Sequence, residues 1–163
     1  VVLGGSGQSP TDGYTPGGTW STWAGQVNHW LSYGFDADVV VIQGCCNGFT
    51  THDAWRGALD VLIAVARQHD PGGDRRIILA TTPRIVPGTS PYVEANHIDD
   101  AIEGSNAVIR EIPGVAVADL DLYWSVDWEP VWDVPGLGVV RMPDALHLNA
   151  LGCRAAAQLI ADT

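Results

Sequence analysis

Two residues near the end of the chain have the types and spacing of a catalytic base and the acid that orients it. In PDALHLNALG, residues 143–152, Asp144 and His147 stand three positions apart, just before an alanine-rich segment. A serine hydroxyl becomes a useful nucleophile when an imidazole takes its proton and a carboxylate holds the other ring nitrogen. Asp144 and His147 can supply that pair from one short loop. A capping aspartate beside an ordinary half-buried histidine is the alternative explanation.

The surrounding sequence resembles the SGNH (GDSL-like) hydrolases. RMPDALHLNALG and the helix after it resemble the closing block of that family, in which D-x-x-H supplies the acid and base of a Ser-His-Asp triad. ADVVVIQGCCNG resembles the third block, with Asn47 on its asparagine, although Gly48 replaces the usual Asp and CysCys replaces the usual small residues. GSNAVIREIPGVAVADL resembles the late helix and strand, with Asn106 and Asp119 at commonly occupied positions. The resemblance spans nearly the whole chain, and the D-x-x-H block is its specific part.

The nucleophile of this resemblance depends on how VVLGGSGQSPTDG is aligned. Aligned with the first family block, a strand followed by G-D-S, it makes Ser6 the nucleophile, with Gly5 in place of Asp. Two observations count against this alignment. Ser6 is followed by the helix breakers of GQSPTDGYTPGG, and the interval up to Asn47 has room for one helix but no further strand.

The second family block, with a pattern like N-L-G-V-S-G-A-T-T-A-D, matches the same stretch at more positions. The matches are Leu3, Gly4, Ser6, Gly7 and Asp12. In this alignment, which we favour, the resemblance implies that the backbone N–H of Gly7 and the side-chain amide of Asn47 form the oxyanion hole. The nucleophilic serine would then lie upstream of Val1, and if the chain is complete, Ser6 is the nucleophile.

Other candidate motifs are weaker. GGSGQS lacks both the Lys-Ser/Thr of a P-loop and the G-x-G-x-x-G spacing of a dinucleotide site. The remaining histidines, which have no metal-ligand spacing, are His29, His52, His69 and His97. We therefore expect no cofactor and no metal. A nucleophilic Cys45 or Cys46 with His147 as its base is an alternative, although small buried packing residues are the favoured interpretation.

The tryptophans divide into two groups. Trp20, Trp23 and Trp30 recur at helical spacing, and we expect them to fill a helix–sheet interface. Trp124, Trp128 and Trp132 lie in DLYWSVDWEPVWDVPG, a stretch that reads as a loop. Core packing is the favoured role for this second group, and a wall of the substrate site is the alternative.

The elements that must position these residues alternate between strand and helix. The apolar runs Val39–Ile42, Ile77–Leu79 and Val115–Val117 predict strands buried in a parallel sheet. Between them, the residues of a possible buried helix face recur at helical spacing in two further segments. They are Trp55, Leu59, Leu62 and Ala66 in the first and Ile98, Ile102, Ser105 and Ile109 in the second. A last helix should run from Asn149, its cap, through Ile160. We expect an α/β fold, a three-layer α/β/α domain with a central parallel sheet of flavodoxin-like SGNH architecture. Functional groups of such sheets gather at the carboxyl ends of the strands.

Size and charge limit the classes of function. The 163 residues fit a single domain over residues 1–163, and no apolar run is long enough to cross a bilayer. The formal net charge of −11 argues against nucleic acid as a partner. Three cysteines provide no disulfide framework. Because the chain begins VVLGG, without Met or a signal-type segment, we expect that its beginning has been cut.

Together these features predict an esterase-type hydrolase that cleaves acyl or acetyl esters of a small molecule or carbohydrate through an acyl-serine intermediate. Two alternatives stay open. The first is an SGNH-like acyltransferase domain that passes the acyl group to a sugar hydroxyl, and the second is a non-catalytic binding domain of the same fold. The resemblance favours an extracytoplasmic or secreted location.

Overall fold

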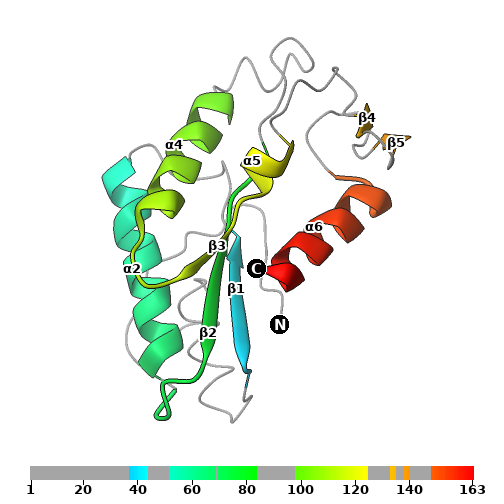
Figure 1. Ribbon diagram of the computed structural model, residues 1–163. Coiled ribbons are helices and arrows are strands. Elements are labelled where there is room, and N and C mark those ends of the chain that lie inside the picture. The colour runs from blue at the N-terminus through cyan, green and yellow to red at the C-terminus, as the bar shows by residue number, and fades with distance from the viewer. Residues whose placement is uncertain are drawn as a thin grey trace. The chain divides into compact units, whose positions relative to one another are not determined.

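The computed structural model describes residues 37–43, 52–68, 70–83, 98–124, 133–134, 138–139 and 148–163. Figure 1 shows strands and helices alternating along these segments, which places the chain in the α/β class as predicted. The strands are β1 (Val39–Gln43), β2 (Arg76–Ala80), β3 (Ala116–Ala118), β4 (Asp133–Val134) and β5 (Gly138–Val139). The helices are α2 (His52–Gln68), α4 (Ile98–Glu111), α5 (Leu120–Trp124) and α6 (Ala150–Asp162).

Strands β1, β2 and β3 form a parallel sheet in that order, with β2 in the middle. All three coincide with the apolar runs that predict strands in the sequence. Central strand β2 is the most deeply buried, because Ile77, Ile78, Leu79 and Ala80 are all at most 5% exposed. A strand covered on both faces reads as a continuous apolar run, which explains why its sequence shows no polar alternation.

The tryptophan-containing stretch DLYWSVDWEPVWDVPG, which the sequence predicts to be a loop, overlaps two short elements, α5 and β4. Residues 120–124 form α5, and β4 pairs in antiparallel fashion with β5, with Asp133 opposite Val139. Helix α5 begins where it does because the carboxylate of Asp119 accepts a hydrogen bond from the N–H of Leu122 at 3.0 Å, as an N-cap does. Trp124 ends α5, whereas Trp128 and Trp132 lie outside the described residues. The expectation for Trp20, Trp23 and Trp30 also falls outside them.

The backbone forms two compact units. Within the described residues, the first contains β1 up to Ile42, α2, β2 up to Leu79 and residues 112–116. The second contains the chain from Ala80 through α4 and from Val117 to the end of α6.

Helix α2 provides much of the core of the first unit. Its predicted apolar face is buried, with Trp55, Leu59, Leu62 and Ala66 each at most 1% exposed. Burying one such leucine stabilises the fold by about 1.5–3 kcal/mol relative to leaving it in water. The side chain of Arg75 ties the end of this helix to the sheet, because Nη1 donates to the carbonyl of Ala66 at 2.8 Å and Nε to that of Ala37 at 2.7 Å.

Helix α4 contributes a face of mixed character to the second unit. Ile102, Val108 and Ile109 are fully buried, as helical spacing predicts for Ile102 and Ile109. Ser105 and Asn106 are buried on the same helix, at 6% and 0% exposure. A buried amide needs hydrogen-bond partners. The partner of the Asn106 amide is the main chain of Thr82, just after the carboxyl end of β2.

Candidate functional site at the carboxyl ends of β2 and β3

The residues predicted to do the chemistry lie outside the described part of the chain. These are Asp144, His147, Gly7, Asn47 and the alternative nucleophiles Ser6, Cys45 and Cys46. Their roles therefore stay predictions. Leu148, which directly follows His147, is the first residue of the described segment 148–163. The helix that follows the D-x-x-H block therefore belongs to the described structure.

That element is α6, and it begins as the sequence predicts. Asn149 has extended backbone angles, and its side-chain oxygen accepts hydrogen bonds from the N–H groups of Leu151 at 2.9 Å and Gly152 at 3.0 Å. These bonds satisfy two of the amides that a helix leaves unpaired in its first turn. The predicted helix after the D-x-x-H block, with Asn149 as its cap, is therefore confirmed.

The side chain of Asn106 binds the main chain just after the carboxyl end of β2, which we call the exit of that strand. Its oxygen accepts from the N–H of Thr82 at 2.8 Å, and its amide nitrogen donates to the carbonyl of the same residue at 2.7 Å. The side-chain amide thereby pairs with a main-chain unit as a neighbouring strand would. This contact fixes the backbone two residues after β2 ends.

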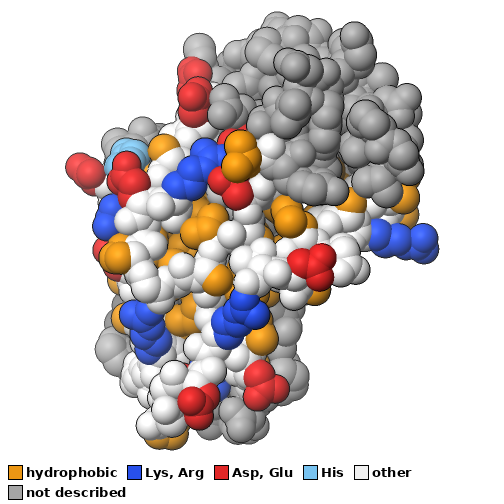
Figure 2. Space-filling model, in the orientation of Figure 1, with side chains coloured by type: hydrophobic (Ala, Val, Ile, Leu, Met, Phe, Trp, Pro, Cys, Tyr) orange, Lys and Arg blue, Asp and Glu red, His pale blue; other side chains and the backbone are white. Residues whose placement is uncertain are grey.

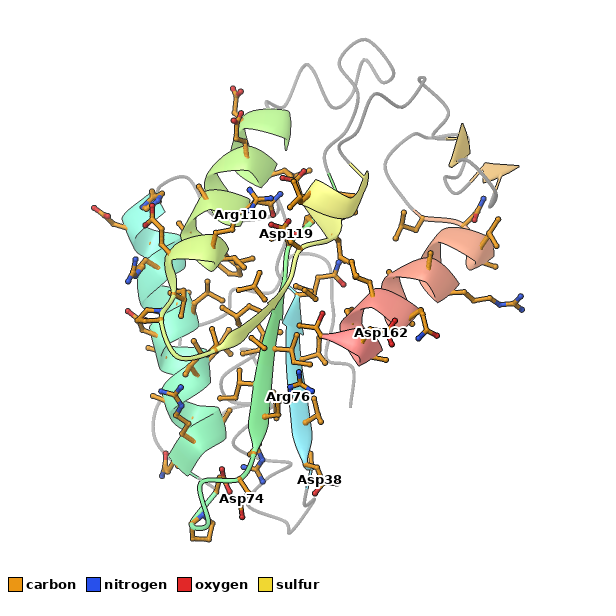
Figure 3. All side chains as sticks on the ribbon, in the orientation of Figure 1. Asp38, Asp74, Arg76, Arg110, Asp119 and Asp162 are labelled. Carbon is orange, nitrogen blue, oxygen red and sulfur yellow. The ribbon has the colours of Figure 1, made fainter. Side chains whose placement is uncertain are left out.

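Arg110, in the last turn of α4, binds Asp119 at the exit of β3. Its guanidinium donates from Nε to Oδ2 of Asp119 and from Nη2 to Oδ1 of Asp119, both at 2.7 Å. Nη2 also donates to Oδ2 of Asp121 at 2.7 Å. Figure 3 shows the Arg110 and Asp119 side chains directed toward each other. A two-pronged arginine–carboxylate contact fixes orientation as well as distance.

Thr81 joins the two exits. Its hydroxyl donates to Oδ1 of Asp119 at 3.0 Å and accepts from the N–H of Asp121 at 2.9 Å, and its own N–H donates to the carbonyl of Ala118 at 3.1 Å. Thr81 is completely buried. We call the set of Thr81, Asn106, Arg110, Asp119 and Asp121 the exit cluster, and all of its members belong to the second unit.

The electrostatics of the exit cluster favour its ionised form. Partial burial acts to raise the pKa of the Asp119 carboxyl, but hydrogen bonds from Arg110, Leu122 N–H and Thr81, with attraction to the guanidinium, hold that pKa below its ordinary value of 3.8. The hydrogen bond to Asp119 likewise raises the pKa of Arg110, against the effect of burial and with help from Asp121. With two carboxylates and one guanidinium, the set carries a formal charge of −1.

The exit cluster is suited to holding the chain in place. The Thr81 hydroxyl is engaged both as donor and as acceptor, so it is not poised as a nucleophile. The side chain of Asp121 is 1% exposed, whereas those of Arg110 and Asp119 are 35% and 23% exposed. Within the described residues, no group of three or more histidine, cysteine, aspartate or glutamate side chains could hold a metal ion.

The surface of the described residues is mixed in charge. Figure 2 shows acidic and basic side chains interspersed with apolar ones over the described part of one face. Cys153 on α6 is exposed and carries a free thiol. Among the helices that the structure describes, none is long and apolar enough to cross a membrane.

Sequence reasoning found part of the exit cluster. Asn106 and Asp119 stand out through the resemblance, but Thr81, Arg110 and Asp121 do not. One local signal was available, because Asn106 and Arg110 are four positions apart and such residues share a face of a helix.

No protein-family model matches the chain, and no curated protein matches it either. The resemblance to the SGNH hydrolases therefore rests on the motifs quoted above.

Proposed function

We propose that this protein is an ester hydrolase of the SGNH type, with a three-layer α/β/α architecture, that cleaves acyl or acetyl esters through an acyl-serine intermediate. The observation that carries the proposal is the D-x-x-H block, Asp144 and His147, placed directly before a terminal helix capped by Asn149. The α/β order of the described elements supports it further.

In the proposed reaction, His147 takes the proton of the serine hydroxyl as the serine oxygen attacks the ester carbonyl carbon. Asp144 holds the other ring nitrogen and stabilises the imidazolium that forms. The backbone N–H of Gly7 and the side-chain amide of Asn47 donate hydrogen bonds to the developing oxyanion. His147 then returns its proton to the leaving alcohol, and a water molecule activated by the same imidazole releases the acid and regenerates the serine.

The nucleophile in this proposal is a serine on a strand that precedes Val1, which leaves Gly7 free for the oxyanion role. Ser6 is the alternative nucleophile. The two versions share Asp144, His147 and Asn47 but differ in which atom His147 deprotonates. A substitution at Ser6 therefore separates them without affecting the shared residues.

The experiment measures hydrolysis of p-nitrophenyl acetate and butyrate by the natural polypeptide that contains residues 1–163. We expect His147→Gln and Asp144→Asn each to lower kcat by about a thousandfold or more, as losses of triad members do. His52→Gln is the matched control, because His52 is an exposed histidine at the start of α2 with 47% of its side chain accessible. Hydrolysis that is equally fast in the His147→Gln and His52→Gln variants would refute the proposed mechanism. Tight sugar binding without hydrolysis would instead favour the binding domain.

A further inference from the structure

We propose that Asn106 and Arg110 are positioning residues that hold the exits of β2 and β3 in the geometry required for catalysis. The inference rests on the proposed ester hydrolysis. It assigns these two side chains a function that neither the D-x-x-H block nor the oxyanion hole supplies.

Asn106 and Arg110 both belong to α4. Asn106 and Arg110 are one helical turn apart, so both project from the same face of the helix. Asn106 binds the main chain of Thr82 at the exit of β2. Arg110 binds Asp119 and Asp121 at the exit of β3. A single rigid helix face thus fixes two neighbouring strand exits.

Thr81 joins these two contacts. Its backbone continues β2, and its hydroxyl bonds to both the carboxylate of Asp119 and the N–H of Asp121. A shift of either exit would break bonds at the other. The exits are therefore expected to move together or not at all.

The hydrogen bonds and ion pairs of the exit cluster contribute orientation more than stability. The carboxylate of Asp121 is almost completely buried against a guanidinium that is about one third exposed. Buried ion pairs seldom stabilise a fold more than apolar side chains of the same volume would. What they add is direction, because a guanidinium that binds two carboxylates admits few orientations. This network fixes backbone position in a way that an apolar contact would not.

The exit cluster lies at the carboxyl ends of β2 and β3. In parallel α/β sheets, functional groups gather at the carboxyl ends of the strands, where Thr81, Thr82 and Asp119 lie. In the sequence, Asp144 and His147 follow β3 and α5. Catalytic groups lose much of their effect when displaced by about 1 Å, so an anchored exit is worth most at this edge.

The test uses the natural polypeptide that contains residues 1–163, with p-nitrophenyl acetate and butyrate as probes. The variants are Arg110→Met, which removes the charge, Arg110→Lys, which keeps the charge without the planar fork, and Thr81→Val, which removes only the hydroxyl. Arg154→Met is the matched control, because Arg154 is an exposed arginine on α6. Each variant is also followed by hydrogen exchange at the N–H groups of Asp121 and Leu122.

For Arg110→Met we expect kcat to fall by about tenfold or more, with KM changed by less than about twofold, because misplacement affects the transition state more than substrate binding. Arg110→Lys should recover only part of the loss. Thr81→Val should lower kcat less and should accelerate exchange at the N–H of Asp121. It provides the same evidence should Arg110→Met fail to fold.

Two results would overturn the inference in distinguishable ways. If the unsubstituted protein hydrolyses the probes and folded Arg110 and Thr81 variants keep its kcat, the positioning role is wrong while the proposed function stands. If the unsubstituted protein hydrolyses neither probe, the proposed function fails, and the positioning role fails with it. A loss of kcat in Arg154→Met as large as in Arg110→Met would also overturn the role.

Discussion

The side chain of Asn106 and the main chain of Thr82 form a closed pair of hydrogen bonds, in which the amide donates at 2.7 Å and accepts at 2.8 Å. The Asn106 side chain is completely buried, so its two bonds replace those that water would make. An apolar side chain of the same size could form neither of these hydrogen bonds.

We expect Asn106→Leu to reduce the free energy of unfolding by about 1–3 kcal/mol, because it removes the two hydrogen bonds that the Asn106 side chain makes with the N–H and C=O of Thr82. Urea denaturation followed by circular dichroism measures the change. The control is Gln158→Leu, which removes an amide that binds Asp162 on the exposed surface of α6, and it should shift stability by less than about 0.5 kcal/mol. Equal effects of the two variants would contradict the structural role of Asn106.

The Asp119 carboxylate should contribute stability that depends on pH. Its pKa in the folded protein lies below the ordinary value of 3.8, so the folded state binds this proton more weakly than the unfolded state does. The contribution is therefore complete well above pH 3.8 and disappears as pH falls through the folded pKa. The measurement compares the denaturation midpoints of the unsubstituted protein and Asp119→Asn at several pH values. The difference between them should shrink below about pH 4, and a constant difference down to pH 2.5 or so would contradict the prediction.

Replacing the cap of α6 should weaken the helix that follows the D-x-x-H block. Asn149→Ala removes the acceptor for the N–H groups of Leu151 and Gly152, and we expect a loss of about 0.5–2 kcal/mol. Asn149→Asp is the control, since its carboxylate retains the acceptor and interacts favourably with the positive end of the helix. Thermal denaturation of the three proteins gives the comparison. If the cap stabilises α6, the melting temperature of Asn149→Asp should be close to that of the unsubstituted protein and that of Asn149→Ala should be lower.

Two glycines with open space around them should respond in opposite ways to alanine. A Cβ atom at Gly57, within α2, or at Gly73, in the turn before β2, would meet nothing within 4 Å. Gly57→Ala should stabilise the protein by about 0.5–1 kcal/mol, because alanine is the better helix former. Gly73 has a φ of +72°, which an L residue adopts at a cost of about 1–2 kcal/mol, so Gly73→Ala should destabilise. Chemical denaturation of both variants provides the test, and changes of the same sign would contradict the argument.

Ser6→Ala tests the alignment of the glycine-rich segment. We expect hydrolysis by the natural polypeptide to survive this substitution within about tenfold, because on the favoured alignment Ser6 is a turn residue. Gly7→Pro removes the N–H assigned to the oxyanion hole and should lower kcat by about a hundredfold or more. A loss in Ser6→Ala as large as that in His147→Gln would instead identify Ser6 as the nucleophile.

Local features of the fold follow from the sequence. The β-branched run at Val39–Ile42 forms β1, the apolar spacing from Trp55 to Ala66 forms the buried face of α2, and Asn149 caps α6. Each of these signals lies within one element, where side-chain spacing and the needs of a helix end determine the structure. The short helix α5 was not predicted, because the residues that follow its cap, Asp119, read as a loop in the sequence.

The tertiary structure decided how the strand exits are held. Thr81 meets Asp121 across 40 positions of sequence, and Arg110 meets Asp121 across 11. No periodicity connects such residues, since their approach depends on β2 and β3 being neighbouring strands of one sheet. The sequence alone therefore determined the three strands of the parallel sheet, helices α2, α4 and α6, the α/β class and the D-x-x-H block that suggests a reaction. Only the tertiary structure decided which polar side chains meet at the carboxyl ends of the strands. A buried carboxylate needs hydrogen-bond donors, and the fold determines which donors lie within reach.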